Sequence, residues 1–243
     1  MKYTSTKPAI FISRPNRFIS HVLVDGREEI VHVKTTGRCR EILQEGAAVI
    51  LEEADNTNTN RKTKYSLIAA YKDKILINLD SQVPNMVVYE GIKDGSLKEF
   101  QKITRLSREV TYGNSRFDLY FESGGQKGFI EVKGVTLETD GIAMFPDAPT
   151  ERGSKHVYEM IKAVEEGYAG FIFFLVQMKG VEYFTPNTVR DPEFTKALRL
   201  AQEKGVTILA YDALVYEDGI RAGNPVKVVL EKNVPNRLSP TAQ

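Results

Sequence analysis

The chain has 243 residues, enough for one large domain or two small ones with a hydrophobic core. Its 33 basic and 32 acidic residues give a formal net charge of +1, which excludes a protein that binds nucleic acid through overall charge alone. The single cysteine, Cys39, excludes an internal disulfide bond and fits a reducing compartment; we expect it to be structural rather than catalytic.

The first third of the chain predicts short β-strands separated by turn residues such as Asp25-Gly26 and Gly46. The expected strands are at residues 9–12, 17–24, 29–34, 47–52, 64–71 and 75–79. Five or six short strands in about 80 residues are typical of a small closed barrel such as the OB-fold.

After a junction at 81–85, which contains Pro84, helices alternate with strands. In chain order we expect a helix at 86–100, a hairpin of strands 118–122 and 128–135 around Gly124-Gly125, a helix from Thr150 or Ser154 to about 166, a buried strand at 169–177, a helix from Asp191 to about 205 and a last strand at 206–211. This order predicts a mixed sheet with flanking helices. We therefore expect an α+β protein of two domains, 1–83 and 84–243.

The predicted hairpin places Asp118 on one strand and Glu131 and Lys133 on the next. Side chains two apart on a strand share a face, so Glu131 and Lys133 point together while Val132 points into the core. Two carboxylates with several retained waters suit Mg²⁺, and a nearby lysine can orient an attacking water or neutralise charge on a phosphate. The spacing favours a metal-dependent phosphodiesterase site; alternating charges on an exposed strand would give the same triplet.

A second candidate group lies at the start of the helix expected near Thr150. A helix N-terminus offers free amides and a positive dipole to a phosphate. Arg152 and Lys155 could hold a nucleic-acid backbone there, and His156 could assist proton transfer. An ordinary capped helix with surface charges is the alternative.

Basic residues in the N-terminal third form the third candidate group. Single strands bind OB-folds through basic loops and stacking aromatics, which predicts contacts from Arg61, Lys62, Lys64 and Tyr65; a solvated hairpin tip is the alternative. The same surface could extend to Arg14, Arg17, Arg38 and Arg40, although residues 38–41 could equally form internal ion pairs. Gln177, at the end of a buried strand, could reach the metal site or simply be hydrogen-bonded.

Eight stretches carry a family resemblance that runs nearly from end to end. They are RPNRF (14–18), TGRCRE (36–41), RKTKY (61–65), DSQVPN (80–85), EVTYGNSRFD (109–118), FIEVKGVTL (129–137), FPDAPTERGSKH (145–156) and PNTVRDPEF (186–194). In these the chain resembles the sugar fermentation stimulation protein A (SfsA) family. The resemblance implies an N-terminal OB-like barrel, a C-terminal domain of the PD-(D/E)xK nuclease type, DNA binding and an association with the regulation of sugar metabolism, above all of maltose.

Carried over by position, Asp118 matches the first acid of the nuclease motif, and Glu131 and Lys133 match its E-x-K. The Val132 carbonyl would then join Asp118 and Glu131 as a ligand of Mg²⁺ or Mn²⁺. A glutamate on an upstream helix often completes such sites. Glu90 is the candidate for that role, with Glu109 as the alternative. Phe117 stands where the superfamily motif has proline.

Two functions follow from these expectations. One is a DNA-binding, metal-dependent endo- or exonuclease acting on DNA that could be single-stranded or branched, with RNA as a further substrate to test. The other is a non-catalytic DNA-binding regulator of sugar metabolism genes. The chain has no apolar run long enough to span a bilayer, so we expect a cytoplasmic prokaryotic protein that could associate with the nucleoid and has no membrane partner.

Overall fold

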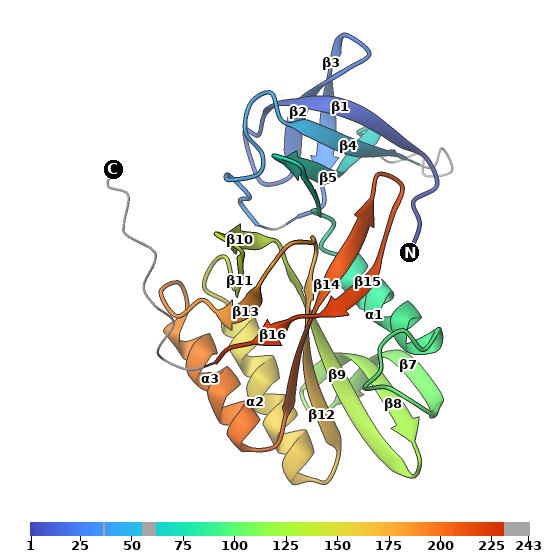
Figure 1. Ribbon diagram of the computed structural model, residues 1–243, viewed down its shortest axis with the longest axis vertical. Coiled ribbons are helices and arrows are strands. Elements are labelled where there is room, and N and C mark those ends of the chain that lie inside the picture. The colour runs from blue at the N-terminus through green and yellow to red at the C-terminus, as the bar shows by residue number, and fades with distance from the viewer. Residues whose placement is uncertain (36, 55–61, 231–243) are drawn as a thin grey trace.

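Antiparallel strands form a barrel at one end of the computed structural model, which describes residues 1–35, 37–54 and 62–230 (Figure 1). The strand order is β3-β2-β1-β4-β5-β6, and a parallel pairing of β3 with β5 closes the first five strands on themselves. The strands are β1 (Thr6–Ser13), β2 (Ile19–Val24), β3 (Arg27–Val33), β4 (Ala48–Glu53), β5 (Tyr65–Lys72) and β6 (Ile75–Asn78). All six predicted strands are confirmed, with ends shifted by a few residues.

Side chains that alternate between buried and exposed positions give the barrel its interior. In β2, Ser20, Val22 and Val24 are buried while the residues between them are partly or fully exposed. Phe11 and Leu51 from neighbouring strands fill the same interior. Closure pairs the edges that an open sheet would leave free, which suits a small domain.

The C-terminal domain is built on a mixed six-stranded sheet of order β15-β14-β12-β9-β8-β7 (Figure 1). Its central strands β9, β12 and β14 are parallel, whereas β7, β8 and β15 pair antiparallel to their neighbours. Its strands are β7 (Ile103–Tyr112), β8 (Ser115–Ser123), β9 (Gln126–Val135), β12 (Ala169–Val176), β14 (Thr207–Tyr216) and β15 (Gly219–Pro225). A smaller sheet of order β10-β11-β13-β16 consists of β10 (Leu137–Thr139), β11 (Ile142–Phe145), β13 (Tyr183–Pro186) and β16 (Lys227–Val228).

Helices cover both faces of the larger sheet. On one face α1 (Val83–Lys93) packs Val87 and Val88 in one core cluster with Ile130 and Val132. On the other face α2 (Glu151–Glu165) and α3 (Pro192–Glu203) lie side by side (Figure 1). The two-domain α+β prediction is confirmed. Among the described residues, no helix is both long and apolar enough to cross a membrane.

Local sequence explains where the helices begin. The Thr150 hydroxyl accepts a hydrogen bond from the Gly153 N–H, and Asp191 accepts one from Phe194, so each caps its helix. Thr150, and not Ser154, is therefore the cap of α2. The Gly124-Gly125 turn is confirmed: both glycines have positive φ, as the two-residue turn between the paired Ser123 and Gln126 requires.

Three predictions of chain path were wrong. The helix expected at 86–100 is α1, which begins inside the supposed junction because Pro84 is tolerated in a first helical turn. It ends at Lys93, since Gly95 adopts a positive φ. The strand expected to be last, 206–211, is β14; it continues to Tyr216 and is followed by β15 and β16.

Candidate metal and nucleic-acid site

The first predicted acid lies where β8 and β9 stop pairing. Their ladder ends at Leu119 opposite Ile130, and beyond it Asp118 Oδ2 accepts the Val132 N–H at 2.8 Å. The carboxylate therefore takes the place of a backbone acceptor. In a strand, the N–H and C=O of one residue point to the same edge, so the Val132 carbonyl points toward Asp118 as well.

The helix α1 supplies the second contact of Asp118. Asn85 Nδ2 donates to Oδ1 at 2.6 Å. Burial and the nearby charge of Glu131 raise the pKa of Asp118 to about 6, against the lowering effect of its two hydrogen bonds and of Lys133. Asn85 was not predicted as a site residue. It ends the DSQVPN stretch, and its polar side chain in a motif that adjoins the expected helix is the signal that could have identified it.

Glu131 is the most buried member of the site, with 2% of its surface exposed. Its Oε1 accepts from Lys133 Nζ at 2.6 Å and is hydrogen-bonded to His156 Nδ1. Burial alone would raise the pKa of Glu131, but the bonds from His156 and Lys133 outweigh it, so the pKa lies below its usual value. Its Oε2 is buried and has no hydrogen-bond partner in the part of the chain that the structure describes.

Glu131 Oε2 is the observation by which we judge whether these residues fit a divalent cation. A buried carboxylate oxygen without a partner is costly, and a cation would satisfy it. Residues 1–35, 37–54 and 62–230 contain no cluster of three or more His, Cys, Asp or Glu side chains suited to a metal ion. Magnesium is usually held by one or two carboxylates and keeps several waters, so Asp118, Glu131 and the Val132 carbonyl fit it.

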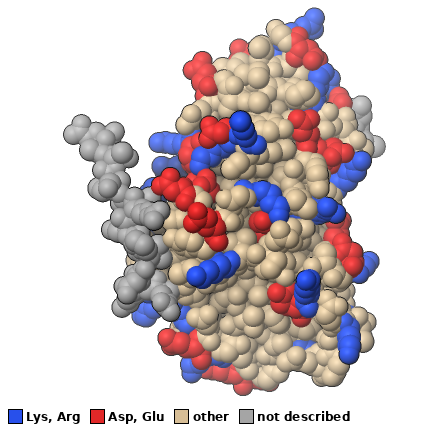
Figure 2. Space-filling model, viewed as in Figure 1, with Lys and Arg blue, Asp and Glu red and all other residues tan. Residues whose placement is uncertain are grey.

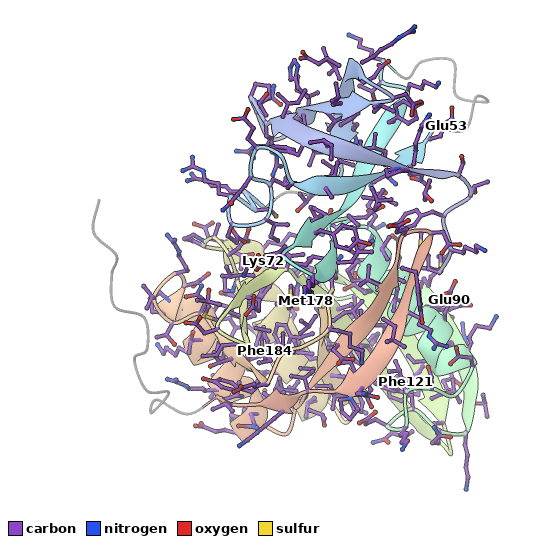
Figure 3. All side chains as sticks on the ribbon, turned by 45° about the horizontal axis from the view of Figure 1, so that its top comes forward. Glu53, Lys72, Glu90, Phe121, Met178 and Phe184 are labelled. Atoms are coloured by element: carbon purple, nitrogen blue, oxygen red, sulfur yellow. The ribbon has the colours of Figure 1, made fainter. Side chains whose placement is uncertain are left out.

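Neither glutamate proposed to complete the site lies there. The Glu90 carboxylate pairs with the N-terminal ammonium group of Met1, and Figure 3 shows Glu90 at the margin of the molecule. Glu109 is exposed on β7, where its partner is Arg116 at 3.6 Å. The helix presents Asn85 to the site, and Glu90, five residues on, lies on a different side of α1.

The helix α2 brings one of its three predicted residues to the acids. His156 is buried against Glu131. Arg152 and Lys155 are exposed, and Lys155 Nζ lies 3.5 Å from the Asn114 carbonyl just before β8. Neither of these two cations forms an ion pair with Asp118 or Glu131.

Lys133 opens onto a hollow of about 200 Å³ between the two domains. Gly37, Thr136, Leu137, Phe145 and Asp147 line this hollow and also a larger cleft of about 1100 Å³. The larger cleft lies between the barrel loops at 14–17 and 37–41 and the segment 145–150 before α2. The two hollows are thus contiguous.

The structure divides the predicted basic residues of the barrel into two groups. Arg17, Arg38 and Arg40 are exposed and line the larger cleft. Arg14 lines it too, but its guanidinium donates to the carbonyls of Arg17, Thr35, Gly37 and Arg38 and so holds the two loops together. Arg14 is therefore a structural residue, which corrects its assignment to phosphate binding.

The second basic group lies away from both hollows. Lys62 and Lys64 are exposed, and Lys64 approaches Glu53 at 3.5 Å. Tyr65 is 4% exposed and belongs to the barrel core, so it cannot offer a stacking face to a base. Arg61 lies outside the described residues. Burial raises the pKa of Cys39 to about 11, which fits its expected structural role.

Gln177 joins the domains rather than reaching the acids. Its amide donates to the Asn78 side chain at 2.9 Å and to the carbonyls of Asn78 and Asp80. Its Oε1 lies where a Cβ at Gly134 would stand. Asp80 in turn accepts from Lys34 Nζ at 2.9 Å. A buried polar network therefore connects the barrel to the strand that carries Glu131 and Lys133.

Comparisons with known proteins match the two parts of the chain to two different family models. Residues 12–79 match the SfsA N-terminal OB domain, and residues 82–219 match the sugar fermentation stimulation protein RE domain. A sugar fermentation stimulation protein homolog of Alkaliphilus oremlandii is 56% identical over 232 residues, which cover 94% of this chain and 98% of that protein. A homolog of Desulfitobacterium hafniense is 53% identical, covering 95% and 99%.

A solved structure also matches over nearly the whole chain. It is SfsA of Pyrococcus furiosus in complex with Ca²⁺, with a TM-score of 0.85 and 27% identity, covering 94% of this chain and 98% of that one. The arrangement of an OB domain followed by a mixed α/β domain is therefore common to both proteins.

Proposed function

The chain belongs to the sugar fermentation stimulation protein family, and we propose that it is a divalent-metal-dependent nuclease that binds DNA and hydrolyses its phosphodiester bonds. The observation that carries the proposal is Glu131 Oε2, a buried carboxylate oxygen without a partner among the described residues, beside a second carboxylate and a lysine. The solved relative with bound Ca²⁺ supports a divalent cation. We propose Mg²⁺ or Mn²⁺ for catalysis, because both suit oxygen ligands.

The chain's own residues would share the work as follows. Asp118, Glu131 and the Val132 carbonyl would hold the cation, which when bound would supply Lewis-acid stabilisation of the phosphate and a more acidic water. Lys133, which lines the smaller hollow, would orient the attacking water or stabilise negative charge on the phosphate.

Two further residues would position the acids. Asn85 and the Val132 N–H fix both oxygens of Asp118, and His156 fixes one oxygen of Glu131. With its Nδ1 engaged on Glu131, His156 acts here as a positioning residue rather than as the proton donor. The site would thus be preorganised before substrate arrives.

The direct test is cleavage of labelled single-stranded, duplex and branched DNA and of RNA, with Mg²⁺ or Mn²⁺, by wild type and by Asp118→Ala. The proposal expects metal-dependent products that disappear in the variant. Equal cleavage by the purified variant would remove the assignment. RNA-specific products would point to a site that uses the 2′-hydroxyl.

Two observations favour a second candidate, a DNA-binding regulator without turnover. Lys133 and His156 already occupy Glu131 Oε1, and the described residues contain no cluster of three ligating side chains. Such a regulator of sugar metabolism genes would bind DNA with strong salt dependence but form no product. Retained binding without cleavage in the same assay would favour it. For either activity we propose a cytoplasmic protein that acts on DNA.

A further inference from the structure

The larger cleft concentrates positive charge that the chain as a whole lacks. Arg17, Arg38 and Arg40 line it from the barrel, and Arg190 lines it from the C-terminal domain. All four are exposed, and none forms an ion pair with any residue that the structure describes. Glu41 and Asp147 are the acidic lining residues. Figure 2 shows a group of basic side chains at the left edge of the molecule, beside the barrel. A local basic surface of this kind is the footprint of a phosphate backbone.

The cleft continues through a narrow passage into the smaller hollow, which is lined by Lys133. Gly37 and Asp147 line both hollows, and a Cβ at Gly37 would lie 2.6 Å from Asp147 Oδ2. Barrel and C-terminal domain therefore almost touch between the arginines and Lys133. The inner hollow, at about 200 Å³, is much smaller than the cleft of about 1100 Å³. A track that narrows in this way favours one strand over a duplex.

An exposed aromatic residue is the sequence neighbour of one residue of this track. Phe18 follows Arg17 directly in the loop between β1 and β2, and 63% of its surface is exposed. The corresponding loop is one of those through which OB-folds bind oligonucleotides. A free aromatic face stacks on unpaired bases, which duplex DNA does not offer.

We infer that the substrate of this site is a single unpaired nucleic-acid strand, held between the barrel and the C-terminal domain. Arg17, Arg38 and Arg40 contact its phosphates, Phe18 stacks on a base, and the narrow passage admits one strand to Lys133. The inference rests on the proposed nuclease function for its final step. The binding track itself can be tested without turnover.

The test is the fluorescence anisotropy of labelled oligonucleotides with the full chain in EDTA. The probes are a single-stranded DNA, an RNA of the same sequence, a blunt duplex and a duplex with a single-stranded tail. We expect the single strand and the tailed duplex to bind more tightly than the blunt duplex; the RNA probe then separates a ribose-dependent strand from DNA. Equal or tighter binding of the blunt duplex would overturn the inference.

Charge variants locate the track. Counterion release on a single strand gives a salt slope of about 0.7 per phosphate contact, so Arg38→Ala with Arg40→Ala should reduce the slope by about 1.4 and weaken single-strand binding roughly 25-fold at 0.1 M salt. The matched control is Lys62→Ala with Lys64→Ala, which removes two exposed cations from the same domain outside both hollows. An equal effect from the lysine pair would contradict the track.

Phe18→Ala adds a readout that charge cannot mimic. It should weaken binding of the single strand by roughly tenfold while leaving residual duplex binding unchanged, because stacking needs an unpaired base. Cleavage then separates the two proposals. Lys133-dependent cutting inside a blunt duplex, as fast as in a single strand, would overturn the track and keep the nuclease. Arginine-dependent binding of a single strand without any cleavage would keep the track and remove the nuclease.

Discussion

Two acid–lysine pairs in the C-terminal domain differ in how many hydrogen-bond donors reach each carboxylate oxygen. Lys179 Nζ lies 2.8 Å from both carboxylate oxygens of Asp212, and the Asn224 N–H donates to Oδ1 at 2.6 Å. Every carboxylate oxygen of that pair has a donor. Glu131, in contrast, receives two donors on one oxygen and none from the described residues on the other. A closed pair stabilises a fold, whereas an open pair leaves free energy to be gained by a ligand.

The largest expected difference between the pairs is in catalysis. Lys133→Ala should lower the single-turnover cleavage rate by about 10²- to 10³-fold, the usual effect of removing one preorganised electrostatic group. Lys179→Ala should leave the rate per folded molecule nearly unchanged and lower the free energy of unfolding by about 1–3 kcal/mol, because Asp212 loses its partner. Full activity in Lys133→Ala would break the contrast.

Metal-linked stability gives the second difference. A divalent cation at a hundredfold excess over its Kd should stabilise the protein by about 2.7 kcal/mol. Thermal unfolding with Mn²⁺, Mg²⁺ or Ca²⁺ against EDTA measures this stabilisation. It should vanish in Glu131→Gln and persist in Lys179→Ala. Stabilisation that survives Glu131→Gln would place the cation elsewhere.

The pH dependence of the metal-free protein sharpens the contrast further. The pKa of Asp118 rises from 3.8 in the unfolded chain to about 6, so its contribution to stability is complete below about pH 4 and is lost as the pH rises through 6. The loss is about 2 kcal/mol after allowance for partial exposure of the side chain. Urea unfolding between pH 4 and 7 in EDTA should show it, and Asp118→Asn should flatten it. An unchanged slope in the variant would assign the effect to another group.

The smallest expected effect is that of replacing Asn85, the residue of α1 that contacts Asp118. Asn85→Ala removes one donor from Asp118 and should lower kcat about tenfold, from roughly 1.5 kcal/mol for a hydrogen bond to a charged group. Single-strand affinity measured in EDTA should stay unchanged, since Asn85 lines neither hollow. A variant that loses affinity as much as kcat would show that Asn85 contacts the substrate instead.

The sequence predicted those elements whose signals come from residues close together in the chain. Alternation in β2, the cap at Asp191 and the glycine turn between β8 and β9 each depend on neighbours a few residues apart. The short strands β10, β11, β13 and β16 could not be predicted in the same way, because their pairing depends on partners far along the chain. Strand β7 was missed because it is an edge strand without a buried face.

The candidate site also has a part that local sequence predicts and a part that depends on how distant elements pack. Glu131 and Lys133 share a face because they are two apart on one strand, so the sequence was sufficient to pair them. Whether Asn85 or Glu90 would meet Asp118 depends on how α1 is rotated against the sheet. Likewise, the mostly apolar segment that predicts β5 does not say that Tyr65 faces the barrel interior.

The hydrogen bonds of Gln177 have a consequence for protein engineering. Its amide is shared by Asn78 and Asp80 on the barrel side, and its oxygen fills the space over Gly134, next to Lys133. A chimera that exchanges barrels between relatives must therefore transfer 78, 80, 134 and 177 as one unit. Isolated halves would expose an interface built for permanent contact, so a barrel alone is a poor surrogate for the intact chain.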